Sequence, residues 1–272
     1  MDIILILADF GFQKVTIMMN KPLTFMLPDN KIKIALVGCG GTGSFIAQDI
    51  ARIAYHQKQK GKDIDITFVD FDFIEEKNVG RQNFVYSEIG KNKAETLALR
   101  YNMAYGLKIS FDLSILQNNR LSYLDGEINI VVGAVDNNKA RKVIHKIAEQ
   151  QSSEFLWLDC GNYHNGGQIL LGNSFLKGNE DYRLNLCRNI PYPSVQMKEL
   201  IRKEKEIKVS CADAVLREEQ TLMINRAMAT FAGQYLYDLI VKREINKYQT
   251  FINLNGCCAK TNFLNKNMWE IK

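Results

Sequence analysis

The sequence predicts a doubly wound α/β fold with a mainly parallel sheet, followed by a C-terminal helix and a β-hairpin. Strand and helix patterns alternate from Lys31 onward, which is typical of such sheets. Residues 128–135 form a near-continuous apolar run, as expected of a strand buried on both faces. A glycine-rich turn at residues 38–43 follows the first strand and precedes a helix that begins near Thr42.

Each further element is predicted from its own pattern of apolar residues. The expected strands are residues 31–37, 64–69, 107–113, 128–135 and 155–158, with an antiparallel strand at 166–172. The expected helices are residues 91–105, 138–151 and about 212–242, the last with a long apolar side. A terminal hairpin at residues 250–264 turns at Asn255-Gly256, a pair that favours tight turns.

One domain is expected, with an extension before it. Residues 31–272 form the predicted domain, and residues 1–30 form an N-terminal extension or arm. Within the domain, the polar stretch at about 177–210 lacks strong periodicity, which is typical of a functional loop or crossover. The apolar residues 1–8 are interpreted as an edge strand or dimer arm, or as sequence before a translation start at Met18 or Met19.

Composition excludes several classes of protein. Of the 272 residues, 46% are hydrophobic and 24% are charged, as in ordinary globular proteins. The net charge of +5 is modest and the basic tract at 201–208 alternates in sign, so we expect no nucleic-acid binding. Residues 1–8 resemble neither a signal peptide nor a membrane span. The six cysteines form no C-x-x-C pair, which favours reduced thiols and a cytoplasmic location.

The glycine turn has the pattern of a phosphate-binding turn. Gly38, Gly40 and Gly43 satisfy G-x-G-x-x-G, and Gly41 and Thr42 lie between them. A side chain there would block the turn and keep a phosphate away from the backbone. The free N–H groups and the dipole of the following helix attract the negative charge. The alternative is a tight β–α turn without a ligand.

Polar residues after the second strand indicate which nucleotide binds. Asp70 ends that strand, where a carboxylate contacts a ribose in NAD and ATP enzymes alike. Asn78, Arg81 and Gln82 follow a second carboxylate, Asp72. A dinucleotide dehydrogenase has no use for a cation there. An arginine fork does stabilise the charge that builds on an α-phosphate when a carboxylate attacks it.

Two further charged residues fit the same chemistry. Lys93 lies in the first turn of a predicted helix, and without that context it would be interpreted as a solvated surface lysine. Asp136 ends the fourth predicted strand, where it can hold Mg²⁺ against phosphates. The alternative for Asp136 is an N-cap of the next helix. Together the motifs predict ATP-dependent adenylation of a carboxylate.

These motifs resemble those of the ThiF/MoeB family, the bacterial relatives of ubiquitin-activating enzymes. The shared features are G-x-G-G-x-G at 38–43, D-x-D…N-x-x-R-Q at Asp70, Asp72, Asn78, Arg81 and Gln82, G-x-x-K-A at 90–94, and D-N…R at Asp136, Asn137 and Arg141. The resemblance covers about residues 31–242. The form of the glycine turn and the terminal hairpin look most like the PRTRC-system branch of the family.

The resemblance implies a Rossmann-like enzyme that binds ATP and Mg²⁺. It would adenylate the C-terminal carboxylate of a small ubiquitin-like (β-grasp) protein and release pyrophosphate. By resemblance, Asp70 contacts the ribose, Arg81 and Lys93 the phosphates, and Asp136 the metal, while Asp72, Asn78, Gln82 and Asn137 complete the nucleotide site. A homodimer is also expected, because the apolar side of the helix at 212–242 needs cover.

The sequence departs from the family in two ways. Members with a structural zinc carry two C-x-x-C pairs, and this chain has none, so no zinc is expected. The family often supplies an arginine from the partner subunit's N-terminal region, but here no arginine precedes Arg52. Either a lysine such as Lys14 or Lys21 takes that role, or the contact is absent. His56, His145 and His164 lack metal-ligand spacing.

Cys211 occupies the place where some relatives keep a reactive cysteine. At the start of a long helix its thiol pKa could be lowered, because the helix dipole favours the thiolate. The alternative is a small buried residue that caps the helix. Cys187, in the polar crossover, is the second candidate for a thioester.

Two other functions compete with activation of a ubiquitin-like protein. One is adenylation of a small molecule or a tRNA base, as in the dehydratases that form cyclic threonylcarbamoyladenosine. The other is a nucleotide-binding module without catalysis. The presence of Arg81, Lys93 and Asp136 together argues against the second of these.

Overall fold

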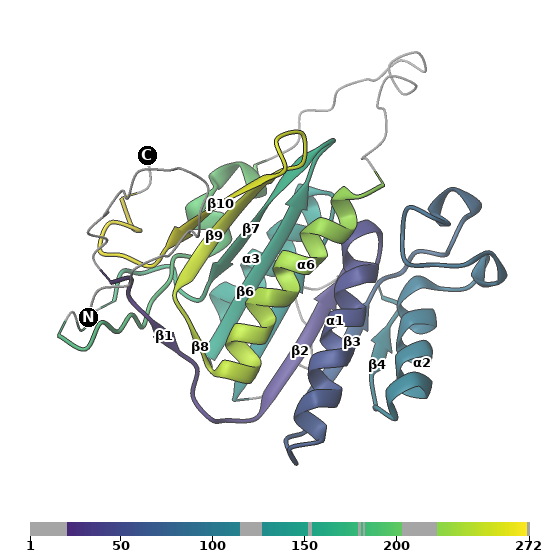
Figure 1. The fold of residues 1–272 in the computed structure, drawn as a ribbon, viewed down its shortest axis with the longest axis horizontal. Coiled ribbons are helices and arrows are strands. Elements are labelled where there is room, and N and C mark those ends of the chain that lie inside the picture. Colours follow the sequence, from purple (N-terminus) through teal and green to yellow (C-terminus); the bar gives the residue numbers. More distant parts are fainter. Residues whose placement is uncertain are drawn as a thin grey trace, which may run out of the picture.

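The computed structural model describes residues 21–114, 127–151, 154–178, 181, 183–202 and 222–270. A central eight-stranded sheet has the order β10-β9-β7-β6-β5-β2-β3-β4 (Figure 1). Its parallel strands are β2 (Ile32–Val37), β3 (Asp65–Val69), β4 (Ser110–Asp112), β5 (Ile128–Gly133) and β6 (Glu154–Asn162). Its antiparallel strands are β7 (Gly166–Gly172), β9 (Lys247–Asn253) and β10 (Cys258–Phe263). A separate two-stranded sheet pairs β1 (Phe25–Met26) with β8 (Glu244–Ile245).

Helices cover both faces of the sheet (Figure 1). One face carries α1 (Gly41–Lys58), α2 (Lys93–Tyr105) and α6 (Ile224–Tyr237), which continues as the π-helical turn η4 (Asp238–Lys242). The other face carries α3 (Asn138–Gln150), α4 (Pro193–Gln196) and the 3₁₀ turn η3 (Lys198–Ile201). Two more 3₁₀ turns, η1 (Glu76–Asn78) and η2 (Tyr86–Glu88), lie between β3 and α2.

Alternation along the strands divides the core into two clusters. Ile34 and Leu36 of β2 pack in the cluster under α1, α2 and α6, whereas Ala35 and Val37 pack in the cluster under α3. Successive strand side chains point to opposite faces, so one apolar strand supplies both layers. Trp157 of β6 is the largest of the fully buried side chains and lies in the α3 cluster.

The predicted doubly wound, mainly parallel sheet is confirmed, including the antiparallel strand at 166–172 and the terminal hairpin. Two strands of the parallel part of the sheet differ most in length from the prediction. The predicted strand at 155–158 runs on to Asn162, and the one at 107–113 shortens to β4. The apolar run of β6 breaks at Asp159, which is nevertheless buried because Arg141 pairs with it.

Several predictions fall on residues outside the described ranges. Residues 1–20, residues 203–221 with Cys211, and therefore the first part of the predicted helix at 212–242 are among them. The rest of the predicted extension is described, and Leu23, Phe25 and Leu27 are buried in the main core. None of the helices in the described part of the chain combines the length and the apolar character needed to cross a bilayer.

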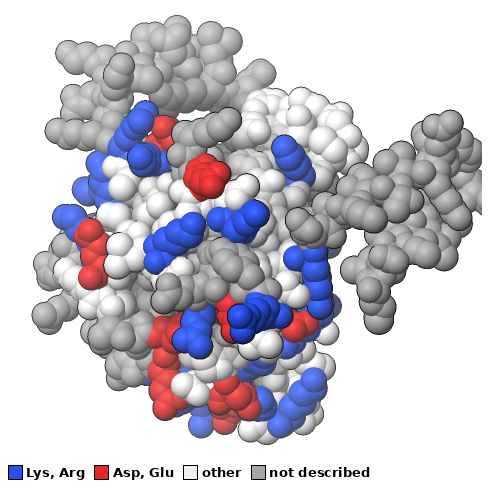
Figure 2. Space-filling view, turned by 90° about the vertical axis from the view of Figure 1, so that its left-hand side faces the viewer, with Lys and Arg blue, Asp and Glu red and all other residues white. Residues whose placement is uncertain are grey.

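Charges on the surface are mixed. On the face that Figure 2 shows, lysine and arginine side chains lie among aspartate and glutamate side chains. Salt bridges in the described part of the chain include those of Lys62 with Asp29 at 2.7 Å and of Arg202 with Glu199 at 3.1 Å. This face does not carry the single-sign charge that is typical of surfaces that bind nucleic acid.

Candidate functional site

The glycine turn between β2 and α1 cannot accommodate side chains at two positions. Gly38 has φ +89°, and a Cβ there would lie 2.6 Å from the carbonyl oxygen of Ala134. A Cβ on Gly43 would lie 1.9 Å from the carbonyl oxygen of Gly38. Both contacts are with backbone that cannot move aside, so glycine is required by the fold of the turn itself.

The N-terminus of α1 is open. The helix begins at Gly41, its N-cap Gly40 makes no side-chain hydrogen bond, and no acidic residue lies in the first turn. The first N–H groups of a helix have no partner within the helix, and together with the helix dipole they favour an anion. The turn therefore presents backbone N–H donors to an anion at the carboxyl end of β2.

Asp70 organises the turn from beside it. One carboxylate oxygen accepts the Cys39 N–H at 2.6 Å, and the other accepts the Asp72 N–H at 2.8 Å. Burial raises the pKa of Asp70, and these two N–H groups and the Lys93 charge oppose that rise. A carboxylate has about four lone-pair sites, so Asp70 keeps acceptors for a ligand hydroxyl.

Lys93 is buried at the start of α2. Its side chain is 8% exposed, and its Nζ contacts Oδ2 of Asp72 at 2.9 Å, while the Asp72 side chain is 51% exposed. The Asn92 side chain donates to the carbonyl oxygens of Asp70 and Asp72, each at 3.0 Å. These bonds hold Lys93 next to the end of β3. Its interpretation as a solvated surface lysine is therefore wrong.

The segment between η1 and α2 carries the other predicted phosphate ligands. Asn78 is buried, and its side-chain oxygen accepts the Glu75 N–H at 2.8 Å, so it shapes the local turn. The side-chain nitrogen of Gln82 lies 3.9 Å from the place where a Cβ of Gly40 would be. Among the described residues, the buried Oε1 of Gln82 has no hydrogen-bond partner.

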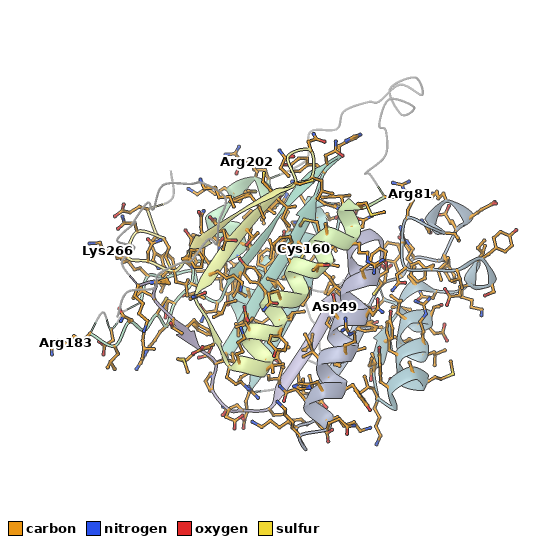
Figure 3. The ribbon with its side chains drawn as sticks, in the orientation of Figure 1. Asp49, Arg81, Cys160, Arg183, Arg202 and Lys266 are labelled. Atoms are coloured by element: carbon orange, nitrogen blue, oxygen red, sulfur yellow. The ribbon has the colours of Figure 1, made fainter. Side chains whose placement is uncertain are left out.

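Arg81 has no ion-pair partner within the described ranges, so its guanidinium is available for a ligand. Figure 3 shows Arg81 near the first turn of α6, beside the segment that follows β3. Its carbonyl oxygen accepts a hydrogen bond from the Asn225 side chain of α6 at 3.3 Å.

Asn83 and Arg100 belong to none of the sequence motifs, but they hold the segment with Arg81 and Gln82 in place. The Asn83 N–H donates to Oγ of Ser44 at 2.9 Å, and its side chain donates to the Ser44 carbonyl oxygen at 3.3 Å. Arg100 donates to the Asn83 carbonyl oxygen at 2.8 Å and forms a salt bridge with Glu88 at 2.6 Å. The segment with Arg81 and Gln82 is thereby attached to both α1 and α2.

Asp136 follows β5, which pairs with β2 on the side opposite β3. It is exposed, and the Asn137 side chain donates to its Oδ1 at 3.1 Å. Asn137 caps α3 by accepting the Ala140 N–H at 2.8 Å. The alternative role of Asp136 as the N-cap is therefore wrong, and its carboxylate faces solvent.

A buried ion pair supports the loop that carries Asp136. Nε of Arg141 donates to the Asp159 carboxylate at 3.1 Å, and its Nη2 donates to the Val135 carbonyl oxygen at 2.7 Å. Burial raises the pKa of Asp159, and the Arg141 charge opposes that rise. The guanidinium therefore joins α3 and β6 to the residue that precedes Asp136.

The described cysteines do not supply an accessible thiol near the turn. Cys187 is 2% exposed, and its Sγ lies 3.3 Å from the Asn189 carbonyl oxygen. Cys39 is fully buried, and burial raises its pKa well above the usual value. The exposed Cys257 and Cys258 lie at the turn between β9 and β10. Cys211 lies outside the described residues, so its role remains a prediction.

The residues present fit a nucleoside triphosphate. The four glycines of the turn carry no side chains that would keep a phosphate from its backbone, and the first turn of α1 has no side-chain cap. The side-chain nitrogen of Gln82 lies beside Gly40, where it can donate a hydrogen bond to a phosphate oxygen. No group of three or more metal-ligating side chains occurs among the described residues. A single exposed carboxylate nevertheless suits Mg²⁺, which usually keeps several waters and binds through one or two carboxylates plus phosphates.

Comparisons with known proteins show the family and the fold of this chain. A sequence model of the ThiF family matches residues 29–257. The ubiquitin-like modifier-activating enzyme 5 of Caenorhabditis elegans is 26% identical over 140 residues, which are 47% of this chain and 31% of that protein. E. coli MccB with ATP is 16% identical with a TM-score of 0.56, over 88% of this chain and 65% of MccB. PaaA is 16% identical with a TM-score of 0.57, over 86% of this chain and 73% of PaaA. The chain thus spans about a third of the curated relative and just under two thirds of MccB.

Proposed function

This chain belongs to the ThiF family, and we propose that it is an ATP-dependent adenylating enzyme that acts on the C-terminal carboxylate of a small ubiquitin-like protein. In the proposed reaction a carboxylate oxygen attacks the α-phosphorus of ATP. The bond from that phosphorus to the bridging oxygen of the β-phosphate breaks, and pyrophosphate leaves. Similarity to a ubiquitin-like modifier-activating enzyme supports this choice of substrate.

One observation carries the proposal: complementary groups from three strand ends meet at one edge of the sheet. The glycine turn follows β2, Asp70, Asp72 and the Arg81 segment follow β3, and Asp136 follows β5. These strands are adjacent and parallel, so their carboxyl ends lie at the same edge of the sheet, which is where doubly wound proteins bind ligands.

Each residue has a role that its surroundings support. The open first turn of α1 would hold the phosphates, and Gln82 would orient them from above Gly40. Arg81 would stabilise the charge that develops on the α-phosphate, and Lys93 would turn from Asp72 toward the same oxygens. Asp136 would hold Mg²⁺, which neutralises phosphate charge when it is bound. Asp70 would contact the ribose.

A homodimer remains part of the proposal, but for a different reason. The predicted need to cover the apolar side of α6 is not supported, because Met228 and Leu236 of that helix are buried in the chain's own core. Phe73, Val85 and Tyr86, which lie between β3 and α2, are instead 60%, 55% and 72% exposed, and a second copy would cover them. Light scattering is expected to show a dimer, and a strict monomer with and without ATP would contradict it.

A thioester on Cys211 is a separate proposal that the adenylation site does not require. If the Cys211 thiolate attacks the acyl adenylate, AMP leaves and an enzyme–partner thioester forms. Cys211→Ser should then keep ATP–pyrophosphate exchange and lose a conjugate that reducing agents cleave. Exchange and conjugate both unchanged in that variant would contradict it. Loss of the conjugate in Cys187→Ser alone would move the thioester to that residue, despite its burial.

ATP–pyrophosphate exchange tests the proposed function. The purified chain with a ubiquitin-like protein encoded nearby should incorporate labelled pyrophosphate into ATP. The matched control is the same partner with an amidated C-terminus, which has no carboxylate to attack and should give no exchange. Exchange with a small acid or a tRNA and none with any ubiquitin-like protein would favour the small-molecule or tRNA-base alternative. ATP binding with no exchange in any combination would favour the non-catalytic module.

A further inference from the structure

We infer that Asn225 is a positioning residue that holds Arg81 and the glycine turn of α1 at a fixed separation. The inference rests on the proposed function, since it assumes that phosphates of ATP lie on that turn. Asn225 is the second residue of α6 and is 3% exposed. It belongs to none of the motifs in the sequence.

Three segments that are distant in the sequence meet at this one amide. The Thr42 hydroxyl, in the first turn of α1, donates to Oδ1 of Asn225 at 3.2 Å. The Asn162 side chain, at the end of β6, donates to the same oxygen at 2.7 Å and to the Thr42 hydroxyl at 3.1 Å. Nδ2 of Asn225 donates to the Arg81 carbonyl oxygen at 3.3 Å. Both ends of the amide are therefore engaged.

The contact between α6 and the turn is also steric. A Cβ on Gly41 would lie 2.7 to 2.9 Å from the Asn225 side-chain atoms Oδ1, Nδ2 and Cγ. The backbone of Gly41 is in the first turn of α1, where the phosphates would lie. The amide thus fills the space that a side chain at this glycine would occupy, and it sets how closely α6 approaches the turn.

Fixing the Arg81 backbone matters because none of the described residues forms an ion pair that would hold the guanidinium itself, so its place depends on the backbone that carries it. The Arg81 N–H bonds the Asn78 carbonyl oxygen at 3.2 Å, within the same segment, whereas Asn225 ties Arg81 to α6 and the glycine turn. A positively charged group stabilises developing charge only if it is held near the required place, and an error of about 1 Å can cost about a hundredfold in rate. The helix itself does not need the amide to stay attached, because Ile224, Met228 and Leu236 already bury its apolar side. We therefore assign the hydrogen bond between Asn225 and Arg81 to the positioning of the nucleotide site and not to the attachment of α6.

A double-mutant cycle on ATP binding tests this assignment without requiring turnover. Calorimetry with ATP and Mg²⁺ on the full chain would compare wild type, Asn225→Ala, Arg81→Ala and the double variant. We expect Asn225→Ala to weaken binding about tenfold, and to weaken it less than about twofold when Arg81 is already alanine. Equal losses in both backgrounds would show that Asn225 acts without Arg81 and would overturn the inference.

Controls separate positioning from loss of stability. Thr230→Ala removes a side-chain hydrogen bond to Arg226 on the same helix, at 3.0 Å, and should leave ATP binding unchanged. Should Asn225→Ala fail to fold, Asn225→Ser, which keeps a hydroxyl in the cluster, takes its place in the same cycle.

A second arm asks whether Asn225 only fills space. Gly41→Ala should weaken ATP binding, because its Cβ displaces the amide. The variant Gly41→Ala with Asn225→Gly relieves that clash but still lacks the bond to Arg81, so we expect binding to stay weak. A return to within about twofold of wild type would overturn the inference. Wild-type protein that does not bind ATP would instead reject the proposed function.

Discussion

Two ion pairs flank the candidate site, and they are buried to different extents. Arg141 and Asp159 have side chains 8% and 0% exposed, with Nε and Oδ1 3.1 Å apart. Lys93 is also 8% exposed, but its partner Asp72 is 51% exposed, with Nζ and Oδ2 2.9 Å apart. Both members of the first pair, the closed pair, are buried, whereas the second, the open pair, has one half-exposed member in Asp72.

The difference indicates two separate tasks. If either member of the closed pair moved away, the other would remain as an unpaired charge in the protein interior, which is costly. The pair therefore acts as a fixed support. The open pair can exchange partners at low cost, because Asp72 can return to water while Lys93 turns to a phosphate. The closed pair, Arg141 with Asp159, therefore supports the β5 side of the site. The open pair, Lys93 with Asp72, leaves a lysine on the β3 side that can turn to a bound phosphate.

The largest effect on activity is expected at Asp136, in the loop that the closed pair supports. Asp136→Ala should reduce ATP–pyrophosphate exchange about a thousandfold or more, because it removes the proposed metal carboxylate while the closed pair beneath stays intact. Circular dichroism and the thermal midpoint should not change, since Asp136 is exposed. Normal exchange in a folded Asp136→Ala protein would show that the metal site has been misplaced.

Breaking the closed pair should act on stability. Arg141→Met leaves Asp159 buried without a cation, which is expected to cost about 3–5 kcal/mol of unfolding free energy. Burial raises the Asp159 pKa and the Arg141 charge opposes that rise, so removing Arg141 raises this pKa further and the variant takes up a proton more readily than wild type. The loss should therefore be smallest in acid and grow as the pH rises through that pKa. Urea unfolding at acidic and neutral pH measures it, and a loss that does not depend on pH would contradict this explanation.

Breaking the open pair should act on activity. Lys93→Met is expected to reduce exchange about a hundredfold while changing the unfolding free energy by less than about 1 kcal/mol. Arg141→Met is the matched comparison, since it also replaces a cation whose side chain is 8% exposed. If Lys93→Met instead destabilised the fold as much as Arg141→Met, the distinction between the two pairs would fail.

The fold was largely predictable because its signals are local. The apolar runs of β2, β3 and β5 fill both faces of the sheet, and the antiparallel β7 and the turn at Asn255-Gly256 lie where their residues indicated. The prediction was least accurate where a tertiary contact overrides the local pattern. Asp159 interrupts the apolar run that predicted β6, and only its pairing with Arg141 from α3 lets the strand continue.

The candidate site was predictable in its motifs but not in its supports. Residues at a fixed spacing, such as the glycines of the turn, can be found in one sequence. Asn83, Asn162 and Asn225 are single amides on separate elements, and nothing in their neighbours distinguishes them from surface asparagines. Their importance arises only when folding brings those elements together. The burial of Lys93 likewise depends on Asp72, 21 positions earlier.

Transfer of oxygen from the partner to AMP tests the central claim most directly. The ubiquitin-like protein would carry heavy-oxygen label in its C-terminal carboxylate, and the adenylate formed with ATP would be decomposed by a nucleophile such as hydroxylamine. If the carboxylate attacks the α-phosphorus, AMP retains one labelled oxygen and pyrophosphate carries none. Unlabelled AMP, or ADP with phosphate as the products, would contradict adenylation of that carboxylate.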